Sequence, residues 1–228
     1  MDVNNVTRED VAYSFVKGAI GSVPIPGAAL FSELFGIIIT PPLEKRRNEW
    51  MQDISERLKQ LEESGCDLSS LSSNDKFVDI ALQASTLALK TSQKEKINAF
   101  KNVITNAAIG QAPDEAKSQI FLSFLADFTV LHLNILHLFD DPIEWFRIRN
   151  IQPPNVIMGT MLTVLTSAFP ELGSEKELIE FIWNDLEQAG LHNVGGSLQT
   201  MMSGEGTLSR RTTNLGREFI AFISAPNI

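Results

Sequence analysis

Two histidines, His132 and His137, are the first residues whose type and spacing could support a chemical function. They lie five residues apart in the apolar run TVLHLNILHLF. That spacing turns the two rings well apart around a helix, whereas a helical metal pair is about four residues apart. No carboxylate or cysteine joins them at ligand spacing. We therefore expect two histidines on the flank of a core helix, and no metal.

Cysteine and glycine offer two further kinds of chemistry, and neither pattern is complete. Cys66 is followed by Asp67, and a neighbouring carboxylate disfavours the reactive thiolate. The glycines of GAIGSVPIPG lack the Lys-Ser/Thr pair of a phosphate-binding loop. The sequence thus predicts no cofactor and no enzymatic activity. An enzyme whose site is assembled from distant residues is the alternative that this pattern leaves open.

The longest uncharged segment lies near the start of the chain. Within residues 18–43 the only charged side chain is Glu33, and Pro24 and Pro26 divide the segment into two short halves. We expect a helical hairpin that avoids water either in a protein core or in a lipid interface. In lipid, the large apolar side chains would make the contact: Phe31, Leu34, Phe35, Ile37, Ile38 and Ile39. The cations that follow would meet anionic headgroups: Lys45, Arg46 and Arg47.

Apolar residues recur at helical spacing along the rest of the chain, with turn residues between the runs. The expected helices cover 8–22, 28–39, 41–64, 77–90, 92–109, 113–125, 129–139, 156–169, 174–189 and 215–223. Ser92 with Glu95, and Ser174 with Glu177, predict capping boxes at two helix starts. The fold class is mainly α: a helical bundle with the apolar hairpin over 1–127, then a winged-helix-like α+β region over 128–228.

The end of the chain resembles many winged-helix domains. The strings DLEQAGLHNV and TTNLGREFIAFI match the end of one helix and the start of the last one, on either side of a Gly- and Ser-rich stretch. The matching residues are Leu186, Gly190, Leu191, Thr213, Leu215, Gly216 and Phe219. The resemblance implies a β-wing between the two strings, on which Arg210 and Arg211 would be the wing contacts.

DNA binding does not follow from this resemblance. A recognition helix must bring basic or amide side chains to bases and phosphates. The helix SEKELIEFIWNDLEQAG instead carries five carboxylates and one lysine, Lys176. Two arginines on the wing do not offset that face, so we expect no nucleic acid partner. A winged-helix transcriptional regulator is the alternative function.

In layout the whole chain is similar to bacterial proteins of the abortive infection alpha family. The resemblance rests on GAIGSVPIPGAAL, PPLEKRRNEW, FVDIALQAS and LGREFIAF. It implies a bacterial or prophage protein concerned with phage exclusion, and it supplies no catalytic residues.

Composition limits which compartment and which kinds of partner we expect for this protein. The net charge is −9 and the pI is near 4.9, which disfavours broad affinity for nucleic acid. The start, MDVNNVTRED, lacks the basic region of a secretory signal, and a single cysteine permits no intrachain disulfide. We expect a cytoplasmic protein, peripheral at the inner membrane where the hairpin meets lipid. Together with the resemblance to the abortive infection alpha family, these features lead us to expect a non-enzymatic interaction or effector protein in phage defence, with a protein partner or a second copy of itself.

Overall fold

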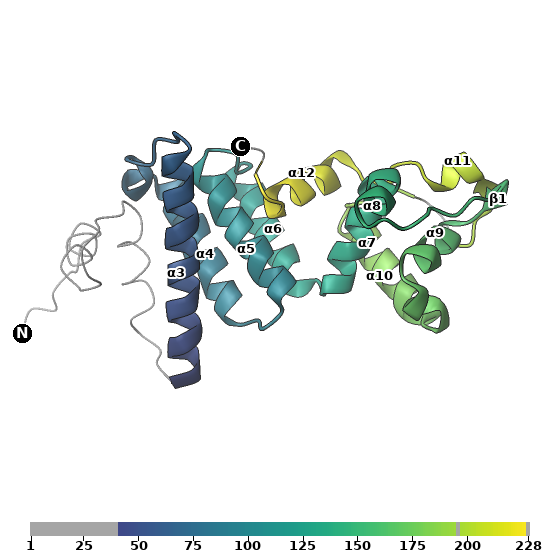
Figure 1. The fold of residues 1–228 in the computed structure, drawn as a ribbon, viewed down its shortest axis with the longest axis horizontal. Helices are drawn as coiled ribbons and strands as arrows, with labels where there is room; N and C mark the ends of the chain where they lie inside the picture. The colour runs from purple at the N-terminus through teal and green to yellow at the C-terminus, as the bar shows by residue number, and fades with distance from the viewer. Residues whose placement is uncertain (1–40, 195–196, 227–228) are drawn as a thin grey trace, which may run out of the picture. The chain divides into compact units, whose positions relative to one another are not determined.

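A computed structural model describes residues 41–194 and 197–226 of the chain (Figure 1). These residues are mainly helical, with one small two-stranded sheet. The α-helices are α3 (Pro41–Glu63), α4 (Asp75–Leu89), α5 (Lys94–Ala108), α6 (Glu115–Asp127), α7 (Val130–Asp140), α8 (Pro142–Ile148), α9 (Met161–Ala168), α10 (Lys176–Gln188), α11 (Gly204–Thr207) and α12 (Asn214–Ile223). Two short 3-10 helices cover Leu71–Ser73 and Pro170–Ser174. Residues 18–40 of the predicted apolar hairpin lie outside the described residues.

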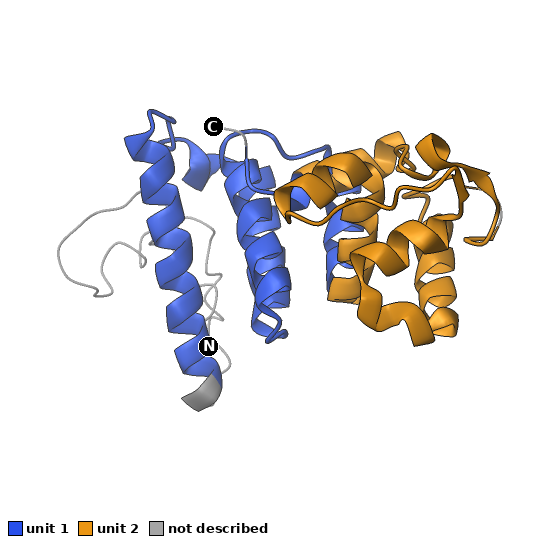
Figure 2. Ribbon diagram, turned by 45° about the vertical axis from the view of Figure 1, so that its right-hand side comes forward, with its two compact units in different colours: residues 1–126, 222–228 blue, residues 127–221 orange. Residues whose placement is uncertain are grey.

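The chain divides into two compact units (Figure 2). Unit 1 comprises the described residues up to 126 together with those from 222 onward, and unit 2 comprises 127–221. The last two residues of α12, Phe222 and Ile223, therefore belong to unit 1. The hydrophobic periodicity of the sequence does not predict this return of the chain end.

In unit 1, α3, α4 and α5 run alongside one another (Figure 1). In the sequence, apolar residues at helical spacing predict a buried stripe along this helix: Leu43, Trp50, Ile54, Leu58 and Leu61. The last four are buried, and Leu43 is half-buried. Apolar side chains at this spacing lie on one face of a helix, and burying that face stabilises it. Asn74 caps the start of α4, where its side chain accepts the Phe77 N–H at 3.1 Å.

Two asparagines of α5 hold the end of the chain on unit 1. Asn106, which is 2% exposed, donates its side-chain amide to the carbonyls of Phe222 and Ser224 at 2.9 and 3.0 Å. Asn102 donates to the carbonyl of Ile223 at 2.9 Å. These carbonyls lie at the C-terminal end of α12, where the helix leaves them without intrahelical donors. The two amides therefore satisfy groups that burial would otherwise leave unpaired.

In unit 2 a short antiparallel sheet joins segments on either side of α9 and α10. Strand β1 (Met158–Gly159) pairs with β2 (Met202–Ser203), and an isolated bridge joins His192 to Thr212. The prediction of a helix from Val156 is wrong, since α9 begins only at Met161. Residues just before α9 form β1, and the Ile157 carbonyl accepts the Gly204 N–H at 3.0 Å.

Both predicted capping boxes are wrong, and two others take their place. Ser92 and Ser174 do not cap, because α5 starts after Gln93 and α10 after Glu175, neither with a side-chain cap bond. The capping boxes that form are Thr129 with His132 on α7 and Thr160 with Thr163 on α9. Neither has the Glu or Gln at the third position by which such a box is recognised in a sequence.

The segment after α10 approaches the start of α12 backbone to backbone. Gly190 takes φ 71°, as predicted for a glycine that ends a helix. The Thr213 N–H donates to the Leu191 carbonyl at 3.0 Å, and the Thr213 hydroxyl donates to the Gly190 carbonyl at 2.7 Å. A Cβ placed on Gly216 would lie 2.2 Å from the Leu191 oxygen. Only glycine fits at this point.

We therefore expect Gly216→Ala to destabilise unit 2. The added methyl group forces the two backbones apart, which should lower the free energy of unfolding by about 1–3 kcal/mol. Urea unfolding followed by circular dichroism measures the change. Gly173→Ala is the matched control, because a Cβ there meets nothing within 4 Å. Equal stability of the two variants would contradict the close approach.

Candidate functional site

Helix α10 exposes two large apolar side chains. Leu178 is 43% exposed and Phe181 is 59% exposed. In the sequence, the spacing of Leu178, Ile182, Leu186 and Ala189 predicts one buried stripe. This prediction is wrong for Leu178, because Ile179 is buried in its place. The buried stripe of the helix is Ile179, Ile182, Trp183 and Leu186. Exposed apolar side chains that gather on one helix face are unusual on a monomer surface and are typical of contact sites.

Carboxylates surround these two side chains. Glu177 and Glu180 are exposed on the same side of α10 as Phe181. We name Glu177, Leu178, Glu180 and Phe181 the α10 face. The carboxylate of Glu180 is 3.5 Å from the Gln199 amide, a contact at the limit of a hydrogen bond. The α10 face thus combines an apolar centre with negative charge.

Aromatic packing behind α10 holds this face in place. The Trp183 indole stacks on the His192 ring, with ring centroids 3.8 Å apart, and meets the Phe139 ring edge-on at 4.9 Å. All three side chains are buried. Because aromatic rings bury a large apolar area, this cluster sets the rotation of α10 about its axis. The same rotation turns Leu178 and Phe181 outward.

His192 is neutral in this arrangement. Its Nε2 lies 2.8 Å from the Trp183 carbonyl, which can only accept, so Nε2 carries the proton. Its Nδ1 accepts the Val194 N–H at 3.4 Å. Burial lowers the pKa of His192, against smaller opposing effects of that carbonyl and of Glu187. A second proton, on Nδ1, would point at the Val194 N–H, which has no lone pair to accept it.

The two histidines of α7 have separate surroundings. His132 is buried, stacks on Phe128 at 5.0 Å, and places Nε2 3.5 Å from the Asp185 carboxylate. Burial lowers the pKa of His137, while Asp140 opposes that effect. Among the residues that the structure describes, no group of three or more His, Cys, Asp or Glu side chains could hold a metal ion.

The predicted wing arginines are bonded within unit 2. Arg210 donates from Nε to the Asp140 carbonyl at 2.6 Å and lies 3.5 Å from the Asp140 carboxylate. Arg211 donates its guanidinium to the Gly206 carbonyl, and its backbone N–H donates to the Phe139 carbonyl at 2.8 Å. These bonds engage the Arg210 side chain with the end of α7 and the Arg211 side chain with α11. A phosphate would have to compete with them.

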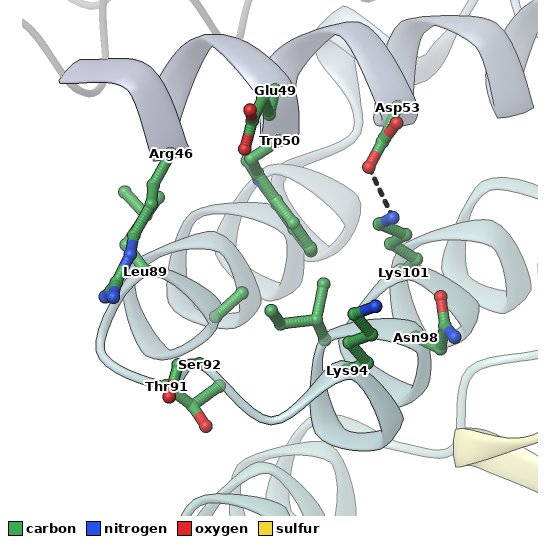
Figure 3. Close-up of a pocket in the computed structure, with 12 residues that line it drawn as sticks. Arg46, Glu49, Trp50, Asp53, Leu89, Thr91, Ser92, Lys94, Asn98 and Lys101 are labelled. Carbon is green, nitrogen blue, oxygen red and sulfur yellow. Dashed lines mark hydrogen bonds and ion pairs between the residues drawn. The ribbon is translucent and has the colours of Figure 1, made fainter. Parts of the chain in front are cut away.

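The cations at the start of α3 do not form one surface. Lys45 is exposed and lies 3.8 Å from the Glu49 carboxylate one turn along the helix. Arg46 instead extends from α3 into a pocket (Figure 3). Arg47 is half-buried. Consecutive helix residues point about 100° apart, so one helix cannot place all three cations on one face. The predicted lipid contacts of the apolar segment, Phe31, Leu34, Phe35, Ile37, Ile38 and Ile39, lie outside the described residues.

No protein-family model, curated protein or solved structure matches this chain. Within the ranges 41–194 and 197–226, no single helix has the length and apolar character to cross a membrane. The pair α6 and α7, taken together across the break between them, meets that test by length and composition.

His192 should make unit 2 sensitive to mild acid. Because burial lowers its pKa in the folded state, the unfolded chain binds more protons below about pH 6.5. The contribution of His192 to the stability of the fold is therefore complete above that pH and is lost as the pH falls below it. Thermal unfolding from pH 7.5 to 5.5 should therefore show a smaller loss for His192→Gln than for the wild type. We expect the variant to be about 1–3 kcal/mol less stable at pH 7.5, since it loses the stack on Trp183.

The comparison also separates His192 from the other titrating groups. Gln at position 192 keeps a donor for the Trp183 carbonyl but cannot take up a proton. The pKa of His137 is lowered by burial as well, so a pH dependence of the same sign persists in the variant. Parallel pH curves for the two proteins would show that His192 makes no contribution.

Proposed function

We propose that this chain is a non-enzymatic interaction protein of the abortive infection alpha type, which binds a protein partner through the α10 face. The observation that carries the proposal is the exposed pair Leu178 and Phe181 among carboxylates. The resemblance in layout to the abortive infection alpha family supports a role in bacterial phage defence.

A winged-helix-like identity for unit 2 is the second part of the proposal. The element order α8, β1, α9, a 3-10 helix, α10, β2, α11, α12 supports it. So does the contact among Gly190, Leu191, Thr213 and Gly216, which are residues of the sequence resemblance. In this reading α10 holds the place of the recognition helix, and its exposed face is available for a partner.

The chemistry of the α10 face favours a basic, amphipathic protein segment as its partner. Phe181 and Leu178 offer an apolar ridge one helical turn long, which suits the apolar face of a partner helix. Glu177 and Glu180 flank the ridge and would meet Lys or Arg side chains of the partner. The same carboxylates would repel DNA phosphates, and Arg210 is already bonded to Asp140. Protein binding is therefore favoured over the alternative of a transcriptional regulator.

We expect the double substitution Leu178→Ser and Phe181→Ser to abolish phage protection. Removing an aromatic anchor from the centre of an interface weakens binding by roughly 2 kcal/mol or more. Plaque counts in cells that express the variant should return to those of cells without the protein. Ile143→Ser is the matched control, because Ile143 is 61% exposed on α8 and should leave protection unchanged. Equal plaquing with and without the wild-type chain would overturn the role in defence.

A photo-crosslinker at Asn184 tests the contact itself. Asn184 is exposed one turn beyond Glu180, on the same side of α10. A crosslink there, absent with the crosslinker at Ile143 and lost in the double serine variant, would locate the partner at the α10 face. A crosslink to a second copy of the chain would make the partner a homo-oligomer. Crosslinking to DNA instead would promote the regulator.

Membrane contact of the apolar hairpin is a separate part of the proposal and has its own prediction. Liposomes that contain anionic lipid should float the wild-type protein, because apolar side chains and nearby cations both favour such a surface. Replacement of Ile37, Ile38 and Ile39 by Ser should abolish flotation while circular dichroism stays unchanged. A wild type that stays in solution, with a triple variant that unfolds, would place these isoleucines in a core.

A further inference from the structure

The outer edge of β1 presents backbone groups that β2 does not use (Figure 1). Met158 lies opposite Ser203, and the Gly204 N–H donates to the Ile157 carbonyl beside this pair. Hydrogen-bonded and non-hydrogen-bonded pairs alternate along an antiparallel ladder, so Met158 and Ser203 exchange no bonds. The N–H and the carbonyl of Met158 therefore point away from β2. Neither group has a hydrogen-bond partner among the described residues.

The side chains around this edge are apolar and exposed. Ile157 is 94% exposed, more than any other large apolar side chain in the part of the chain that the structure describes. Met158 and Met201 are each 58% exposed. One such side chain is ordinary on a protein surface, whereas three around one small sheet are typical of a contact site.

The edge also lacks protective charge. The sequence has no charged residue between Arg149 and Glu171, a stretch that contains β1 and the residues on both sides of it. Proteins usually protect a free sheet edge with charged side chains, with proline or with a covering segment. Pro153 and Pro154 limit how far a pairing strand could extend before β1, but they leave the edge at Met158 open.

A second copy of the chain matches this edge in both hydrogen bonding and charge. Two-fold symmetry places the same residue of each copy at the axis. Met158 of one copy can there donate its N–H to the Met158 carbonyl of the other and accept the reciprocal bond. The net charge of −9 makes two copies repel each other, so an uncharged region is where they approach at the lowest electrostatic cost.

The outer edge of β1 suits this pairing better than that of β2. Strand β2 continues directly into α11, whereas residues 151–157 before β1 belong to no helix or strand. Pairing through β1 would also extend the sheet from two strands to four. A two-stranded sheet is marginally stable by itself, and added strands stabilise it.

We propose that two copies of this chain associate through the outer edges of their β1 strands, antiparallel to each other, about a two-fold axis at Met158. The surface is separate from the α10 face, so the inference goes beyond the proposed function and does not rest on it. Because few residues pair, we expect the dimer to be transient, below the buried area of about 1,200 Å² that stable complexes reach.

Sedimentation velocity of the full chain, at concentrations from about 1 to 200 µM, tests the proposal. The wild type should change from monomer to dimer across this range. Ile157→Lys should raise the dissociation constant by about tenfold or more, because a charged side chain opposes pairing at a sheet edge. Ile143→Lys is the matched control, since Ile143 is 61% exposed on α8, and it should associate as the wild type does.

Met158→Pro tests the backbone bonds directly. Proline removes the outward N–H, which makes no bond within the sheet, and it is tolerated on a sheet edge. The variant should therefore remain folded by circular dichroism and lose association. Unchanged association of a folded Met158→Pro would overturn the proposed pairing.

A cysteine at the proposed axis tests the geometry. In a hydrogen-bonded antiparallel pair the two Cα atoms are about 5.5 Å apart, within the range of about 4.4–6.8 Å that a disulfide needs. With Cys66 replaced by Ser, Met158→Cys should give a covalent dimer on oxidation with copper phenanthroline. Ile143→Cys in the same background is the matched control and should remain monomeric on a denaturing gel.

Three further results would overturn the proposal. The first is a wild type that stays monomeric at 200 µM, about the upper end of the titration. The second is equal association of Ile157→Lys and the wild type. The third is a loss of association in the Leu178→Ser and Phe181→Ser variant, which would place the second copy on the α10 face instead. Unchanged association in that variant keeps the two surfaces separate, so failure at β1 leaves the α10 proposal standing.

Discussion

Unit 2 depends on one close approach between two backbones, that of Leu191 and Gly216. The chain leaves α10 at Gly190 with a left-handed turn and reaches Leu191, whose carbonyl accepts the Thr213 N–H. The contact leaves no room for a side chain at residue 216. It fixes where α12 starts relative to the end of α10, and the bridge between His192 and Thr212 follows from it. The position of the end of α10 relative to α12 is thus set by backbone geometry.

The aromatic cluster behind α10 determines which face of that helix is buried and which is exposed. Trp183 is fixed by His192 on one side and by Phe139 on the other. His192 is fixed in turn by the Trp183 carbonyl and the Val194 N–H. A neutral imidazole satisfies both partners, whereas a charged one satisfies only the carbonyl. The stack of Trp183 on His192 is therefore matched to the neutral form of the ring.

Hydrophobic periodicity predicted the helices well where one face is buried. The stripe of Trp50, Ile54 and Leu58 on α3 is confirmed, as is the stop of α10 at Gly190. It failed for Leu178, because Ile179 lies next to it and either residue completes a helical stripe. Which of the two is buried depends on how Trp183 packs, and that is a tertiary contact.

The strands and the pocket could not be predicted for a different reason. β1 and β2 have two residues each, too few for an alternating pattern to be visible. The pocket joins Arg46 on α3 with Lys94 at the start of α5, which only the packing of the helices brings together. In the sequence Arg46 is one of three consecutive cations, and the membrane interpretation treated them as a unit. Helical geometry separates them, so that Arg46 faces the pocket while Lys45 faces solvent.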